Sequence, residues 1–324
     1  MSRPSTFPRW KRVSLALALG CCLWGREVHA DDTSHAAFRS CLSGTCFDPC
    51  DSAANIVRTY GPCACQRRGA LMQWSYGTSF TGGPNLDEPL VTDRPDFTEA
   101  SSTVGRGVAQ IEMGYTYIHD NDGTTTTDSH SYPETLLRYG VWADWLEFRI
   151  AWNYGHQSSE LDDIVGSEDL YLGFKIGLTP QEGILPETAL IPQMVVPTGA
   201  DEMTADRVLP GLNWLYGWDL CETISTAGST QFNSAVDEET NDVYTEWAQS
   251  WTIGYSLTDK LGGYTEWYAL FPHGAETMLP EHYLNGGFTY LISDNIQWDI
   301  RIGGGLNDAA DDLFVGSGVS VRFY

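Results

Sequence analysis

The chain from residue 110 to its end repeats one unit, a stretch of about ten to thirteen residues with alternating apolar and polar side chains followed by a turn. The clearest stretch sets Ile296, Trp298, Ile300 and Ile302 on one face against Gln297, Asp299, Arg301 and Gly303 on the other. A period of two residues is typical of a β-strand whose two faces meet different surroundings. The pattern therefore predicts an all-β protein.

Twelve such stretches can be placed along the chain. They cover 107–118, 134–144, 145–156, 168–178, 188–198, 208–218, 220–232, 244–257, 260–271, 282–292, 295–306 and 312–324. The fifth contains Pro192, and the seventh is rich in Ser, Thr and Gly. Several exceed the ~5–6 residues usual in soluble sheets and approach the ~9–11 of a tilted membrane strand. We expect a transmembrane antiparallel β-barrel of about twelve strands over 107–324.

The connections between these stretches sort into two kinds. The odd-numbered ones (119–131, 155–167, 199–206, 227–243, 272–282 and 307–312) are mostly long, and together hold 18 acidic residues and no Lys or Arg. Most even-numbered ones are tight, as at Asp144-Trp145, around Asp219 and at Ser293 to Asn295. Outer-membrane barrels have long extracellular loops and short periplasmic turns. The acidic loops are then expected outside, where divalent cations would bridge them to lipopolysaccharide.

Aromatic residues gather toward the ends of the apolar faces, where membrane–water interfaces favour them. They include Tyr115, Tyr117, Trp152, Tyr154, Trp214, Tyr216, Trp218, Trp247, Trp251 and Tyr255. We therefore assign these faces to lipid. The terminal Phe323 and Tyr324 would suit recognition by the barrel-assembly machinery.

The N-terminus has the form of a secretory signal peptide over residues 1–30. Basic residues precede an apolar run from Val13 to Trp24, and small residues end at Ala30, the expected cleavage point. Acylation at Cys21 or Cys22 is a weaker alternative, because Leu19 stands where a small residue is usual. A net charge of −25 argues against nucleic acid as a partner, because its phosphates would repel the chain.

Residues 31–70 form a Cys-rich segment expected in the periplasm. An exported chain meets an oxidising compartment, so disulfides are the default for its cysteines. The candidates are Cys41, Cys46, Cys50, Cys63, Cys65 and Cys221. Their spacing matches no zinc or haem pattern, so the sequence predicts no metal site and no cofactor. The five clustered cysteines cannot all pair with one another, so a disulfide between one of them and Cys221 is an open alternative.

If the aromatic faces meet lipid, the opposite faces line the lumen. The expected pore-lining residues are Gln110, Glu112, Arg138, Glu147, Arg149, Asp169, Lys175, Glu246, Glu266, Asp299, Arg301 and Arg322. A charge facing lipid costs about 2–4 kcal/mol at the midplane, so these side chains must point inward. They would form ion pairs across the wall, a polar pore, or both. Residues 71–106, with Gly82-Gly83-Pro84, are expected to be a linker or a plug.

The stretch Thr92-Asp93-Arg94-Pro95-Asp96-Phe97-Thr98-Glu99 resembles the opening motif of a bacterial outer-membrane barrel family, described as "Putative MetA-pathway of phenol degradation". Further similarities lie at Gly107 to Tyr117, Leu146 to Arg149, Val196 to Gly199, Tyr264 to Trp267 and Gly287 to Asn307. The resemblance covers about 92–324 and implies a transporter-like barrel linked to small aromatic or hydrophobic compounds. It also makes Arg94, Asp96 and Glu99 the plug motif. The Cys-rich segment departs from the family.

These features favour an outer-membrane channel for passive uptake of small-molecule solutes over an enzyme. Two alternatives remain open. A lipid hydrolase would need a nucleophile beside a base, and His156, Ser158 and Glu160 lie in a stretch expected to be a loop. A barrel without flux could instead serve as an anchor for the Cys-rich segment.

Overall fold

The computed structural model describes residues 72–73, 84, 86–121, 123–160, 162–237 and 239–324. They belong to one compact unit, Gly69–Tyr324. Its strands are β1 (Ala109–Asn121), β2 (Thr126–Gly140), β3 (Leu146–Ser159), β4 (Asp163–Ser167), β5 (Leu170–Thr179), β6 (Glu187–Val196), β7 (Leu209–Cys221), β8 (Ile224–Val236), β9 (Val243–Ser256), β10 (Leu261–His273), β11 (Glu281–Ser293), β12 (Ile296–Gly305) and β13 (Leu313–Phe323).

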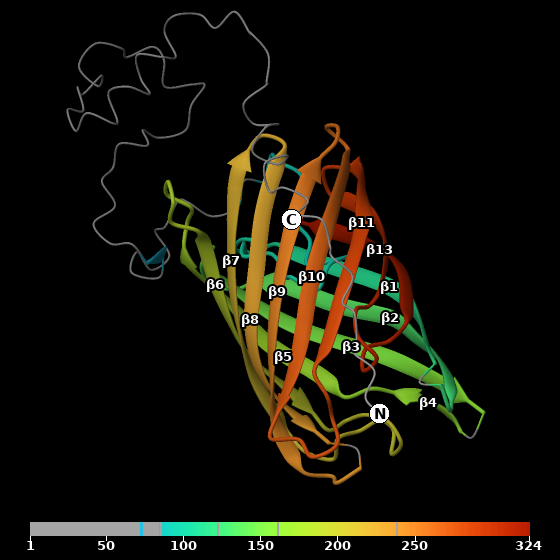
Figure 1. The fold of residues 1–324 in the computed structure, drawn as a ribbon. Coiled ribbons are helices and arrows are strands. Elements are labelled where there is room, and N and C mark those ends of the chain that lie inside the picture. Colours follow the sequence, from blue (N-terminus) through green and yellow to red (C-terminus); the bar gives the residue numbers. More distant parts are fainter. Residues whose placement is uncertain (1–71, 74–83, 85, 122, 161, 238) are drawn as a thin grey trace, which may run out of the picture. The chain divides into compact units, whose positions relative to one another are not determined.

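These strands form one antiparallel sheet that closes on itself (Figure 1). Apart from β4 and β5, strands that follow one another in the chain pair with each other, β1 also pairs with β13, and the β2–β3 ladder completes the circle. β4 and β5 share one place in the wall, because both pair with β3. The thirteen strands thus fill twelve positions, and the predicted twelve-stranded barrel is confirmed. The predicted Cys-rich extension lies outside the described residues.

The two faces of the wall differ as the alternation predicts. Side chains on the inner face include buried Arg138, Glu147 and Lys175, all at 0% exposure. The outer face carries exposed apolar side chains such as Trp214, Trp251 and Ile302. Apolar packing inside is confined to small groups, for example Ala189, Ile191 and Leu215. The interior of this barrel is therefore held together mainly by polar contacts.

Several of the predicted odd loops are wrong in extent. β3 runs to Ser159 and pairs with β4, although 155–167 was expected to be a loop. Similarly, β2 starts at Thr126 and β8 continues to Val236. One even-numbered turn is also displaced, because Asp219 lies within β7 and the chain turns only at residues 222–223. Antiparallel pairing is made by the backbone, so a polar hairpin can extend a wall beyond its apolar band. Alternating hydrophobicity marks only that band.

The fifth and seventh predicted strands, which have unusual compositions, are present as β6 and β8. Pro192 lies on the outer face of β6, and the β5–β6 ladder skips it because proline has no N–H to donate. β8, rich in Ser, Thr and Gly, pairs over its whole length with β9. No helix among the described residues has the length and hydropathy needed to cross a membrane.

Candidate functional site: the lumen and its plug

A segment that precedes the first strand lies inside the barrel. We call residues 86–104 the plug segment. Its backbone is bound by inner-face side chains around the wall: Gln110 and Arg138 donate to the Val91 carbonyl (2.9 and 3.1 Å), and Arg301 donates to that of Pro95 (2.9 Å). The amide of Val104 donates to Glu147 (2.9 Å). The segment therefore crosses the lumen and contacts strands far apart in the sequence.

The densest part of this contact surrounds the Asp93 carboxylate. It accepts from Arg149 (2.5 Å) and from Lys175 (2.8 Å), and Arg138 lies 3.3 Å away. The backbone amide of Ala100 donates to it as well (2.9 Å). Arg138 also pairs with two wall carboxylates, those of Glu112 at 3.1 Å and Glu147 at 2.8 Å. Opposite charges thus satisfy one another where water is excluded.

Glu266 of β10 holds the middle of the plug segment. Its carboxylate accepts from the backbone amides of Phe97 (2.8 Å) and Thr98 (2.7 Å), and from the Thr98 hydroxyl (2.6 Å). The Phe97 ring stacks on Tyr268 with centroids 4.4 Å apart. Because a carboxylate that accepts backbone N–H bonds fixes main-chain geometry, this contact positions the plug segment and not merely one side chain.

Arg94 contacts the part of the wall formed by β2, β1, β13 and β12. Its guanidinium pairs with Glu134 of β2 (2.6 Å) and Asp299 of β12 (3.4 Å). It occupies space left by two paired glycines, Gly114 and Gly318, since a Cβ at either would overlap the guanidinium. These glycines are required by close approach rather than by backbone conformation.

The other plug-motif residues differ in their surroundings. Glu99 pairs with Arg149 and accepts from Asn213 (2.8 Å). Asp96 is half-buried between Pro95 and Phe97.

The remaining predicted lumen residues are less uniform. Arg322 donates to backbone carbonyls of the plug segment and of the turn at 294–295, and Glu246 is half-buried on the inner face of β9. Asp169 lies in the break between β4 and β5 rather than in a strand, so the predicted start of that strand at 168 is wrong. Its carboxylate accepts from the backbone amides of Gly199 and Ala205 (both 2.9 Å).

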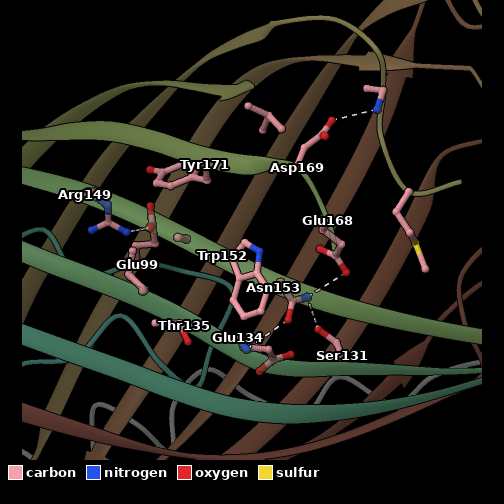
Figure 2. Close-up of a pocket in the computed structure, with 15 residues that line it drawn as sticks. Glu99, Ser131, Glu134, Thr135, Arg149, Trp152, Asn153, Glu168, Asp169 and Tyr171 are labelled. Carbon is pink, nitrogen blue, oxygen red and sulfur yellow. Dashed lines mark hydrogen bonds and ion pairs between the residues drawn. The ribbon is translucent and has the colours of Figure 1, made fainter. Parts of the chain in front are cut away.

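The two larger cavities that border the plug segment lie at different places along it. One of about 720 Å³ lies against Glu99, and we call it the lumen pocket (Figure 2). The other, of about 680 Å³, lies beside Leu90 near the turns after β7 and β9. Figure 2 shows Glu99, Arg149 and Tyr171 at one end of the lumen pocket. At the other end it shows Ser131, Glu134, Asn153 and Glu168.

Sequence reasoning missed Asn153, although this residue organises the pocket. β2 has a register shift between Tyr132 and Thr135, and β3 loses its partner between β4 and β5. The Asn153 amide bridges the two irregularities, donating to Ser131 (2.6 Å) and to Glu168 (2.9 Å). No motif marks a wall irregularity, so the alternation pattern alone could not find it.

Outside the lumen, Asp237 joins two loops. Its carboxylate accepts from the hydroxyl (2.6 Å) and amide (2.9 Å) of Thr277 and from the amide of Glu276 (2.9 Å). These hydrogen bonds, led by that of the Thr277 hydroxyl, lower the pKa of Asp237 from 3.8 to about 2. The ionised carboxylate therefore clasps the β8–β9 and β10–β11 loops together.

The structure bears on three other candidates. His156 contacts Asp163 (2.6 Å), but no hydrogen bond joins it to Ser158 among the described residues. Cys221 is half-buried with its Sγ 3.6 Å from the Thr223 hydroxyl, and the other five candidate cysteines lie outside the described residues. Within the described part of the chain, no group of His, Cys, Asp or Glu side chains is placed to hold a metal ion.

The fold and the lumen define a plugged antiparallel β-barrel with a charged interior and an apolar exterior. The chain belongs to the family described as "Putative MetA-pathway of phenol degradation", whose model matches residues 92–323. No curated protein matches the sequence.

Among solved structures, an outer membrane channel from Pseudomonas putida F1 is similar with a TM-score of 0.57 at 14% identity, over 71% of this chain and 99% of that chain. The NanC porin is a weaker likeness, with a TM-score of 0.42 at 10% identity over 66% of this chain and 100% of that one. At such identities the likeness concerns the fold.

Proposed function

We propose that this chain is an outer-membrane channel through which small molecules pass by diffusion. The observation that carries the proposal is that the barrel has an apolar outer face and a charged interior, the reverse of a soluble protein. Large apolar side chains such as Trp214 and Ile302 are exposed, whereas Arg138 and Lys175 are buried. An apolar band around a whole barrel is not stable in water but matches the hydrocarbon of a bilayer. The similarity to an outer membrane channel supports the same location.

The orientation follows from the turns. In this proposal the long acidic loops face outward and contact lipopolysaccharide, and the short turns and both termini face the periplasm. The signal peptide is then cleaved near Ala30, and the barrel-assembly machinery reads the terminal strand β13. Divalent cations would link the acidic loops to lipid phosphates, so chelation should lower barrel stability.

The plug segment sets the width of the route. It borders the lumen pocket and the cavity near the turns after β7 and β9, and its contacts with Glu266 and with the cations around Asp93 hold it across the lumen. Solutes must therefore be small, or the segment must shift. The family's description links the chain to aromatic degradation, and we propose small aromatic or hydrophobic compounds as the solutes.

The test is flux through the purified full chain. Planar bilayers should show discrete conductance, and liposomes that contain the protein should swell in small solutes faster than empty ones. An electrically silent barrel without solute flux would refute the channel and leave the anchor. Release of fatty acids from lipid by the purified chain would revive the hydrolase.

A further inference from the structure

The lumen pocket has a fixed cover. The loop between β6 and β7, residues 197–208, is held by the Asp169 carboxylate, which accepts from three of its backbone amides at 2.9–3.0 Å. Met203 of this loop packs where Gly155 has no side chain, since a Cβ there would lie 3.1 Å from the Met203 methyl group. The loop is therefore built into the pocket rather than lying free above it.

The body of the pocket is apolar. Its lining includes Leu136, Ala151, Trp152, Val195 and Met203. The side chain of Trp152 points to the outer face and is 43% exposed, but the neighbouring wall irregularities bring it to the rim. A volume of about 720 Å³ falls in the range of pockets that hold small organic molecules.

The one cation in the lining is already neutralised. Arg149 contacts three carboxylates, those of Asp93, Glu99 and Glu147. It therefore has little charge left to attract an anionic solute.

The carboxylates of the lining are not equally satisfied. Glu134 pairs with Arg94, and Asp169 receives backbone amides. Glu168 receives one neutral amide, from Asn153, and no Lys or Arg of the described residues lies within 4.0 Å of it. Among the four lining carboxylates, Glu168 is the one left to take a charged donor from a ligand.

We propose that the lumen pocket binds amphipathic solutes with an apolar body and a cationic head group, which pairs with the Glu168 carboxylate. This inference rests on the proposed function as a channel and names its solute class. A charge-assisted hydrogen bond is roughly twice as strong as a neutral one, so a cation should bind better than an alcohol of the same shape. An anion should bind worst, because four carboxylates face one guanidinium that is already paired.

Calorimetric titration of the full chain in detergent micelles with phenethylamine, phenethyl alcohol and phenylpropionate tests this. We expect the amine to bind at least about 10-fold more tightly than phenylpropionate. Glu168→Gln should weaken amine binding by about 10-fold or more and leave the alcohol within about 3-fold. Glu168→Asp should keep the preference for the amine. Glu160→Gln, an exposed carboxylate outside the lining, is the matched control.

Every outcome of these titrations either supports or overturns the proposal. Equal affinity for the three solutes, preference for the anion, or an amine affinity unchanged in Glu168→Gln would overturn the proposal. The wild-type panel decides even if a variant does not fold. Liposome flux measured in parallel separates the two proposals: binding without any flux refutes the channel and leaves the pocket, whereas flux without preferential amine binding refutes the pocket and leaves the channel.

Discussion

Replacing Asp93 by Asn should loosen the plug segment. Asparagine keeps the shape but replaces one carboxylate oxygen by a donor, so either Arg149 or Lys175 then faces a donor instead of an acceptor. Lys175 should lose more interaction energy than Arg149, because Asp93 is its one carboxylate contact within 4.0 Å among the described residues. The side chain of Lys175 is fully buried and cannot turn to water.

The magnitude follows from the local charge count. Breaking a buried ion pair costs about 3–5 kcal/mol. The cluster holds four carboxylates (Asp93, Glu99, Glu112, Glu147) and three cations (Arg138, Arg149, Lys175). Removing one negative charge leaves three of each, so the lower end, about 3 kcal/mol, is expected. That corresponds to a shift of about 100-fold in the ratio of bound to released plug segment.

Two measurements on the full chain check this expectation. Hydrogen exchange of residues 92–104 should speed up by as much as about 100-fold, and conductance in planar bilayers should rise. Asp308→Asn, an exposed carboxylate in the loop between β12 and β13, is the control. The double variant with Lys175→Met should be less perturbed than Asp93→Asn alone, because it removes the unpaired cation. Unchanged exchange and conductance in Asp93→Asn would refute an electrostatically held plug.

Three further perturbations test other contacts. Ionised Asp237 stabilises its loops at pH values above its unfolded pKa of 3.8, and this stabilisation is lost as the pH falls toward about 2. Asp237→Asn should therefore exchange the amide hydrogens near Thr277 faster than the wild type at neutral pH, as the wild type itself should do in acid. Equal exchange in the variant and the wild type at neutral pH would contradict this. Gly114→Ala should displace Arg94 and raise conductance, and the overpacking should lower the free energy of unfolding by about 1–3 kcal/mol. Asn153→Ala should lower the free energy of unfolding in urea by about 1–3 kcal/mol, and an unchanged midpoint would argue against its bridging role.

The sequence predicts the wall well because period-two alternation is a direct consequence of a two-faced sheet. It places Ile300 outside and Asp299 inside from their parity alone, and the structure agrees. It fails at the ends of strands, as at Ser159 and Val236, because polar hairpins pair through the backbone and carry no apolar signal. It also fails at Asn153, whose role depends on irregularities in two neighbouring strands.

The plug motif shows the same limit from the other direction. A contiguous run such as Thr92 to Glu99 is easy to recognise, but its partners are not. Glu266 lies 168 positions beyond Thr98, and Asp299 lies 205 beyond Arg94. No local pattern connects such residues, because the barrel brings them together only when it closes.

Closure also explains why the motif and the wall charges belong together. Arg138, Arg149 and Lys175 on three neighbouring strand positions would repel one another across an empty lumen. Asp93 supplies a carboxylate at the point where all three meet, and Glu112 and Glu147 alone do not reach Lys175 within 4.0 Å. The wall therefore needs the plug segment as much as the plug segment needs the wall. A barrel emptied of residues 86–104 should be less stable than the intact chain, and an open pore should require a shift of the segment within the lumen rather than its complete departure.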